Sequence, residues 1–191
     1  ELICALTEVT ALCGFRAVEE TVELLRPLST LLRCEQALPG ENFMALYRLP
    51  EETQHAVLKA LPAASASRPE EAAWQWVSRL VTLRPTDISV LAPLYLNLLT
   101  LDRHEALYLD AGTVHAYLEG FGVEVMGSSD NVVRGGLTSK HINREELATV
   151  LYTGATPARV ITAQTNADGW LTWPTDCEYF QLMYSGTAVA P

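Results

Sequence analysis

Positively charged side chains are scarce in this sequence. Its 191 residues include 13 Lys and Arg against 23 Asp and Glu, which gives a formal net charge of −10 at pH 7. Nucleic-acid backbones select surfaces that are rich in Lys and Arg. The charge balance therefore argues against a nucleic-acid-binding protein, and its simplest meaning is solubility.

Patterns that define several other classes of protein are missing as well. The cysteines form no Cys-x-x-Cys pair and have no close spacing to histidine, which argues against a zinc finger or a disulfide framework. We interpret Cys4, Cys13, Cys34 and Cys177 as reduced thiols of a cytoplasmic protein. No apolar run reaches the roughly 20 residues that cross a bilayer, and no nucleotide-binding loop ending in Gly-Lys-Ser/Thr is present.

The first half of the chain has the composition of a helical layer. Residues 1–16 are apolar and predict one or two strands that lead into a helix, while residues 17–100 predict four or five short helices. The predicted apolar face of the first helix consists of Val18, Val22, Leu25, Leu28 and Leu32. Ser67 is expected to open a capping box before a helix whose apolar stripe includes Trp74. The helical runs are expected to be separated by Pro50, Pro62 and Pro85.

The second half changes to short strands with glycine-rich turns. Strands are predicted over residues 106–109, 114–118, 123–126, 159–163, 170–173 and 179–184. One short helix interrupts them, with Asn143 as its N-cap and Glu146 three residues later. Short strands of this kind are typical of a double-sheet barrel, with the helical stretch as an insertion between parts of the barrel.

Three residues on the predicted strands are candidates for chemistry. His115 and Tyr117 lie on one face of a strand because side chains alternate, so both would project into the barrel if that face lines it. Imidazole is a natural zinc ligand, although an isolated histidine on a strand is more often a hydrogen-bonded structural residue. Glu124 interrupts an apolar strand, so it either faces solvent or has a cationic or metal-bound partner.

A loop of small and basic residues extends from Ser128 to Lys140. Its glycines allow the backbone to approach a ligand closely, and Arg134 and Lys140 could bind a phosphate through charge-assisted hydrogen bonds. The alternative is a surface loop in which Asp130 and Arg134 form an ion pair that contributes at most about 1 kcal/mol.

Two motifs together resemble the type I phosphomannose isomerases, a family of cupins. They are Ala111-Gly112-Thr113-Val114-His115-Ala116-Tyr117 and Ser129-Asp130-Asn131-Val132-Val133-Arg134-Gly135-Gly136-Leu137-Thr138-Ser139-Lys140. Residues 1–16 are similar to another segment of that family, and Ala92-Pro93-Leu94-Tyr95-Leu96-Asn97 is similar to the end of its helical insertion. The matches keep the family's order along nearly the whole chain.

The resemblance implies an α+β fold, with a cupin-type β-barrel or jelly roll and an inserted all-helical subdomain. Residues 1–16 would end the first barrel segment, and residues 17–100 would form the helical insertion. Residues 101–158 would supply the catalytic barrel strands and the active-site loop, and residues 159–191 would begin a C-terminal β region, the second cupin.

The resemblance also implies one zinc ion per subunit, bound by a Gln, a Glu and two His. Glu1 matches the Glu and His115 the second His; the other two ligands are expected upstream of a chain truncated at its N-terminus. Three residues match catalytic positions of the family: Arg134, Asp130 and Lys140. Those that match substrate-binding positions are Tyr117, Glu124 and, again, Lys140. Ser139 stands where the family usually has Pro and is expected to loosen the loop that aims Lys140.

The activity that this resemblance implies is the interconversion of mannose 6-phosphate and fructose 6-phosphate. We expect a cytoplasmic monomer that binds a small sugar phosphate and neither nucleic acid nor membrane. A non-catalytic cupin that binds sugar or regulates a partner is the alternative, and within the enzymes a related aldose phosphate or an unphosphorylated sugar stays open. The presence of Glu1, His115 and Arg134 favours the enzyme.

Overall fold

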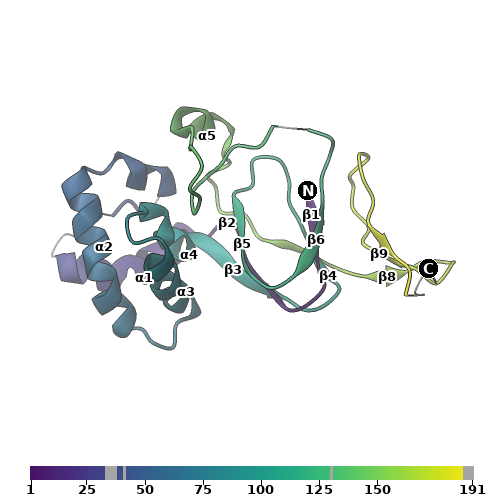
Figure 1. Cartoon of the computed structure of the whole chain (residues 1–191), viewed down its shortest axis with the longest axis horizontal. Coiled ribbons are helices and arrows are strands. Elements are labelled where there is room, and N and C mark those ends of the chain that lie inside the picture. Colours follow the sequence, from purple (N-terminus) through teal and green to yellow (C-terminus); the bar gives the residue numbers. More distant parts are fainter. Residues whose placement is uncertain (33–37, 41, 130, 187–191) are drawn as a thin grey trace. The chain divides into compact units, whose positions relative to one another are not determined.

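The computed structural model describes residues 1–32, 38–40, 42–129 and 131–186. Two residues named above, Cys34 and Asp130, lie outside these ranges. The combination of helices with antiparallel strands confirms the predicted α+β class. The chain divides into two compact units, and Figure 1 labels most of their helices and strands. Unit 1 comprises Glu1–Cys13, Leu99–Val132 and Ala158–Pro191, and unit 2 comprises Gly14–Leu98 and Val133–Pro157.

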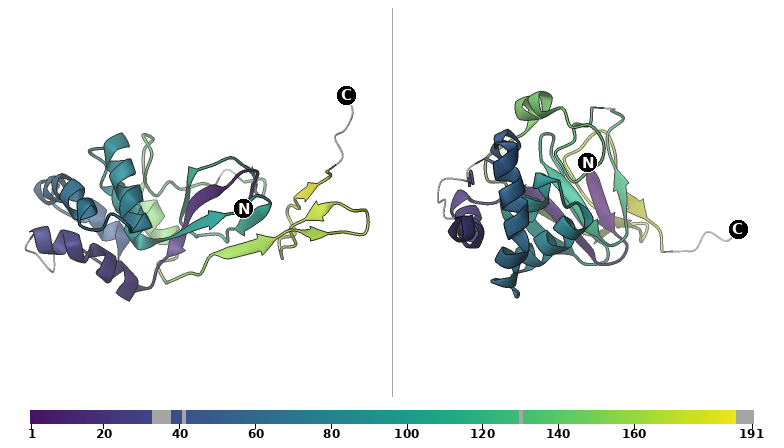
Figure 2. Two further views of the ribbon diagram at one scale, coloured as in Figure 1. Left: turned by 90° about the horizontal axis from the view of Figure 1, so that it is seen from below. Right: turned by 60° about the vertical axis from the view of Figure 1, so that its left-hand side comes forward.

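Unit 1 is built from short antiparallel strands. Its four-stranded sheet has the order β6 (Gly122–Val125), β1 (Leu2–Ala5), β4 (Glu105–Tyr108) and β7 (Arg159–Thr162). A smaller sheet, whose hairpin is seen in green to yellow in Figure 2, has the order β10 (Met183–Tyr184), β9 (Leu171–Thr172) and β8 (Gln164–Thr165). A third sheet has the order β3 (Leu96–Leu101), β2 (Val9–Phe15) and β5 (His115–Glu119), and the ends of β2 and β3 belong to unit 2.

Alternation along β1 divides the core of unit 1 into two clusters. The first cluster contains Ile3, Ala5, Val9, Ala11, Cys13, Leu101, Leu107 and Leu109. The second contains Leu2, Cys4, Ala106 and Trp173. Because both faces of β1 are covered, its sequence is an unbroken apolar run rather than an alternation of apolar and polar residues. The strand predicted over residues 179–184 is shorter in the structure and consists of β10 alone. Its two residues pair with Leu171 and Thr172, which are the whole of β9.

Unit 2 is mainly helical. Its elements are α1 (Val18–Leu32), α2 (Glu51–Ala66), α3 (Ala72–Leu83), α4 (Ala92–Tyr95), α5 (Arg144–Val150) and the 3-10 helices η1 (Phe43–Arg48) and η2 (Ile88–Leu91). Figures 1 and 2 show α1, α2 and α3 packed side by side. The fully buried Trp74 of α3 donates a hydrogen bond of 3.1 Å to the Leu24 carbonyl of α1. Within the described residues, no helix is both long and apolar enough to span a bilayer.

The buried face of α1 differs from the predicted one. Val18 and Val22 are exposed, and the buried residues are Thr21, Leu24, Leu25 and Leu28. Two neighbouring stripes of a 3.6-residue helix share Leu25 and Leu28, so the apolar periodicity could not decide between them.

Two boundary signals in unit 2 were also misread. Ser67 does not open a capping box; it is the C-cap of α2, and its Oγ donates to the Ala64 carbonyl at 2.7 Å. Pro62 lies inside α2 instead of ending it. Burial of Val57 and Leu61 on the same helix is worth about 3–6 kcal/mol for the two side chains together, which offsets the proline's cost of about 3 kcal/mol. By contrast, the predicted cap of α5 is confirmed, since Asn143 Oδ1 accepts from the Glu146 N–H.

Candidate metal centre and active-site loop

Strands β1 and β6 bring two carboxylates to one face of unit 1. Ile3 of β1 is paired with Glu124 of β6, and Glu1 lies two residues before Ile3. Side chains two residues apart on a strand share a face, so Glu1 and Glu124 are diagonal neighbours. Reciprocal backbone hydrogen bonds between Glu1 and Leu109, each 2.9 Å long, hold the start of β1 in this register.

Strand β5 supplies an imidazole and a phenol beside these carboxylates. His115 is paired with Cys13 and Tyr117 with Ala11 of β2. The predicted common face of His115 and Tyr117 is confirmed, with ring centroids 5.6 Å apart. Gly120 makes the turn from β5 to β6 with a φ of +106°, a conformation that L-residues rarely adopt, and a side chain there would collide with the Glu8 carbonyl.

The side chains of Glu1, His115, Glu124 and Tyr117 form one cluster. His115 Nε2 lies 3.3 Å from Glu1 Oε2, and ligand atoms of Glu1, His115 and Glu124 all lie within 4.8 Å of one another. The side chains of Glu1 and His115 are about a quarter exposed, and Glu124 is exposed at the rim. The two residues predicted as zinc ligands are thus neighbours, and Glu124 lies beside them as a possible third donor. The strand pattern had left a metal-bound partner for Glu124 open, whereas the family resemblance assigned it to substrate binding. The position of Glu124 depends on the β1–β6 register, for which the sequence holds no direct signal.

The hydrogen bonds of His115 determine which ring nitrogen can bind a cation. Its Nδ1 lies 3.0 Å from the Thr113 carbonyl, which can only accept, so Nδ1 carries a proton. In the neutral ring, the lone pair of Nε2 then faces the Glu1 carboxylate. Two acceptors at this distance repel each other unless a proton or a cation lies between them. Imidazole nitrogen and carboxylate oxygen are zinc ligands, so this donor set fits a zinc ion.

Tyr117 fixes the third donor. Its hydroxyl donates a hydrogen bond of 2.6 Å to Glu124 Oε1, which leaves the other carboxylate oxygen available. Burial first, and then the hydrogen bond and charge of Glu124, raise the pKa of Tyr117 well above its ordinary value. The phenol therefore stays protonated at neutral pH and acts as a donor.

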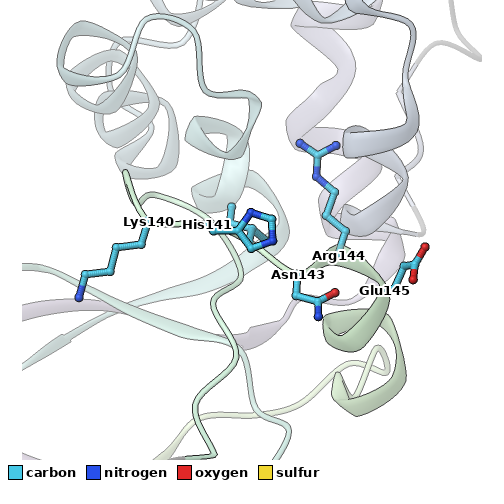
Figure 3. A pocket seen from close by; sticks show the side chains of 6 residues that line it. Lys140, His141, Asn143, Arg144 and Glu145 are labelled. Atoms are coloured by element: carbon cyan, nitrogen blue, oxygen red, sulfur yellow. The ribbon is translucent and has the colours of Figure 1, made fainter.

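The part of the predicted active-site loop that carries Arg134 and Lys140 belongs to unit 2, which takes in the chain from Val133 onward. Arg134 and Lys140 are both exposed, and the predicted contact between Asp130 and Arg134 lies outside the described residues. A depression of about 490 Å³ is lined by residues 140–145 (Figure 3). The side chains of Lys140 and Arg144 point in different directions there, and the Arg144 guanidinium lies 4.8 Å from the centre of the Tyr47 ring. This depression therefore does not gather two cations around a phosphate.

The sequence and the fold were compared with those of known proteins. No family model matches the chain. Its fold is that of phosphomannose isomerase: an apo crystal structure of mannose 6-phosphate isomerase from Salmonella typhimurium has a TM-score of 0.81, with 31% identity over 95% of this chain and 49% of that one. A structure of the same enzyme bound to fructose 6-phosphate and zinc has a TM-score of 0.82 at the same identity, over 95% of this chain and 49% of that one.

The curated relatives carry the same name. The chain is 36% identical over 172 residues to mannose-6-phosphate isomerase of Escherichia coli strain K12, covering 86% of this chain and 44% of that protein. It is 33% identical over 176 residues to human mannose-6-phosphate isomerase, and the match covers 79% of this chain and 42% of the human protein. The chain is therefore a homologue of the mannose-6-phosphate isomerases, and the resemblance seen in its motifs is confirmed. It spans somewhat less than half the length of these relatives.

Proposed function

We propose that the protein carrying this sequence is a zinc-dependent aldose–ketose isomerase that interconverts mannose 6-phosphate and fructose 6-phosphate. The observation that carries this proposal is the convergence of Glu1, His115 and Glu124 in a homologue of the mannose-6-phosphate isomerases. A structural neighbour with 31% identity holds fructose 6-phosphate and zinc.

In this proposal Glu1 and His115 hold the zinc ion, one per subunit, and Glu124 lies close enough to contribute a further oxygen. The bound ion supplies Lewis acidity toward the sugar oxygens, or anchors them. The Thr113 carbonyl orients the imidazole through Nδ1. Tyr117 and Glu124, at the edge of the same cluster, bind sugar hydroxyl groups.

The reaction moves a proton between C1 and C2 of the open sugar and passes through an enediolate. We assign Arg134 to stabilise the developing oxyanion through charge-assisted hydrogen bonds, and Asp130 to orient Arg134. Lys140, on the same loop, has a catalytic and substrate-binding role as a cation for the anionic substrate.

The finer architecture belongs to the same proposal. We infer a cupin-type jelly roll in unit 1, supported by a core cluster to which β1, β2, β3 and the β4 region all contribute. Residues 17–100 would be the all-helical insertion, which agrees with unit 1 being interrupted between Cys13 and Leu99. The resemblance also supports a monomeric, cytoplasmic enzyme.

The decisive experiment uses the full-length protein encoded by its gene. We expect zinc by elemental analysis and isomerase activity in a coupled assay, lost on chelation and restored by zinc. Arg134→Ala should bind zinc normally and lose most of kcat. An active enzyme that resists chelation, or an Arg134→Ala variant with wild-type kcat, would contradict the assigned roles.

A further inference from the structure

The loop that carries Arg134 and Lys140 rests on two side chains of the helical elements in unit 2. The hydroxyl of Tyr47, in η1, donates a hydrogen bond of 2.6 Å to the Gly135 carbonyl. The Leu137 N–H donates a hydrogen bond of 2.8 Å to the Oγ of Ser89, in η2. The two bonds bracket Gly136, so the peptide groups that follow Arg134 are held on both sides.

The backbone between these bonds is strained. Leu137 has a φ of +51°, which a residue with a side chain rarely adopts unless its surroundings impose it, and Gly136 has a φ of +152°, which glycine adopts readily. A Cβ at Gly136 would lie 2.5 Å from the Ser89 Cβ and 2.7 Å from the Tyr47 hydroxyl oxygen. The loop backbone therefore lies directly against the two anchoring side chains, and only glycine allows so close an approach.

Both anchors are themselves fixed. Ser89 is fully buried, and its hydroxyl donates its proton to Asp87 Oδ1 at 2.5 Å, which leaves an oxygen lone pair for the Leu137 N–H. Tyr47 is 7% exposed, and its ring packs edge-on against Phe43 with centroids 5.9 Å apart. Burial raises the pKa of Tyr47 to about 12, so its hydroxyl remains a donor at neutral pH.

We propose that Tyr47 and Ser89 are positioning residues, which fix the loop backbone so that Arg134 is aimed at the reacting sugar. The inference rests on the proposed function, because it presupposes the role of Arg134. A loop without regular secondary structure has many conformations, and a guanidinium stabilises an oxyanion only when it is held close to the final geometry. The helical elements supply that constraint.

The test compares variants of the full-length enzyme, each of which deletes one of the two hydrogen bonds to the loop. Tyr47→Phe keeps the ring and its packing, and Ser89→Ala removes the acceptor for Leu137. We expect kcat to fall about tenfold in each, with KM changed less than about threefold, because misplacement of a catalytic group by a fraction of an ångström has effects of this size. A matched control is Tyr95→Phe: Tyr95 is also buried in unit 2, and its hydroxyl makes no hydrogen bond within the described part of the chain.

Two further measurements separate positioning from a general loss of stability. Hydrogen–deuterium exchange of the peptide over residues 133–140 should be faster in both variants and unchanged in Tyr95→Phe. In an Arg134→Ala background, the anchor variants should lower the remaining kcat less than about twofold, since the group that they aim is gone.

Unchanged exchange and kcat in Tyr47→Phe and Ser89→Ala would overturn the proposal. An equal loss of kcat with and without Arg134 would do the same, because it would indicate a structural role alone. If Ser89→Ala does not fold, the kcat and the hydrogen–deuterium exchange of Tyr47→Phe still test the proposal. A fully active Arg134→Ala enzyme would instead show that the proposed function assigns Arg134 wrongly, and the positioning role would then fall with it.

Discussion

Replacement of Tyr117 by Phe should weaken zinc binding without unfolding the protein. The substitution deletes only the hydroxyl, which donates the 2.6 Å hydrogen bond to Glu124 Oε1. Without it, the exposed Glu124 carboxylate can rotate away from Glu1 and His115, and it must be ordered again when a cation binds.

The size of the effect follows from the geometry. A hydrogen bond to a charged group contributes about 1.5–3 kcal/mol. Tyr117 is 37% exposed, so water replaces part of the lost hydrogen bond. We therefore take the loss of zinc-binding free energy to be about 1–1.5 kcal/mol. At about 1.4 kcal/mol per factor of ten, the Kd for zinc should rise roughly five- to tenfold.

The assay is a competition titration of the metal-depleted full-length protein against a chromophoric zinc chelator. Tyr179→Phe is the control, because Tyr179 lies in the same unit and is 87% exposed. Cobalt substitution offers a second readout, since the visible spectrum of Co²⁺ reports a changed ligand set. Wild-type zinc affinity in Tyr117→Phe, with an unchanged cobalt spectrum, would refute the idea that the phenol holds Glu124 in the metal centre.

Three further predictions concern the metal, the helical core and the buried thiols. His115→Asn should abolish stoichiometric zinc in elemental analysis while the far-ultraviolet circular dichroism stays native; retained zinc would contradict ligation by His115. Trp74→Ala should lower the free energy of unfolding in urea by about 3–5 kcal/mol, because it empties a fully buried site. Burial raises the pKa of Cys4 and Cys13 from 9.0 to about 11. The unfolded thiols therefore ionise first, and the stabilisation present below about pH 9 should be lost as the pH rises to about 11. Urea unfolding under reducing conditions should show a shallower pH dependence in the Cys4→Ala/Cys13→Ala variant.

Sequence patterns predicted the local features of helices and strands better than the way in which these elements pack against one another. Alternation placed His115 and Tyr117 on one face, and the Asn143 cap was identified correctly, because these features depend on neighbours within a few residues. The buried face of α1 was misjudged, since the predicted and the observed stripes share Leu25 and Leu28 and only packing against the other helices selects the one that includes Thr21.

For the candidate site, the sequence by itself determined the types of donor and the motifs around His115 and Arg134. Tertiary structure alone decided that Glu124 joins Glu1 and His115, because that depends on the register of β6 against β1. It also decided that Tyr47 and Ser89 hold the loop at Gly135 and Leu137, residues 88 and 48 positions away. Such long-range hydrogen bonds leave no periodicity in the chain, so only the folded backbone reveals them.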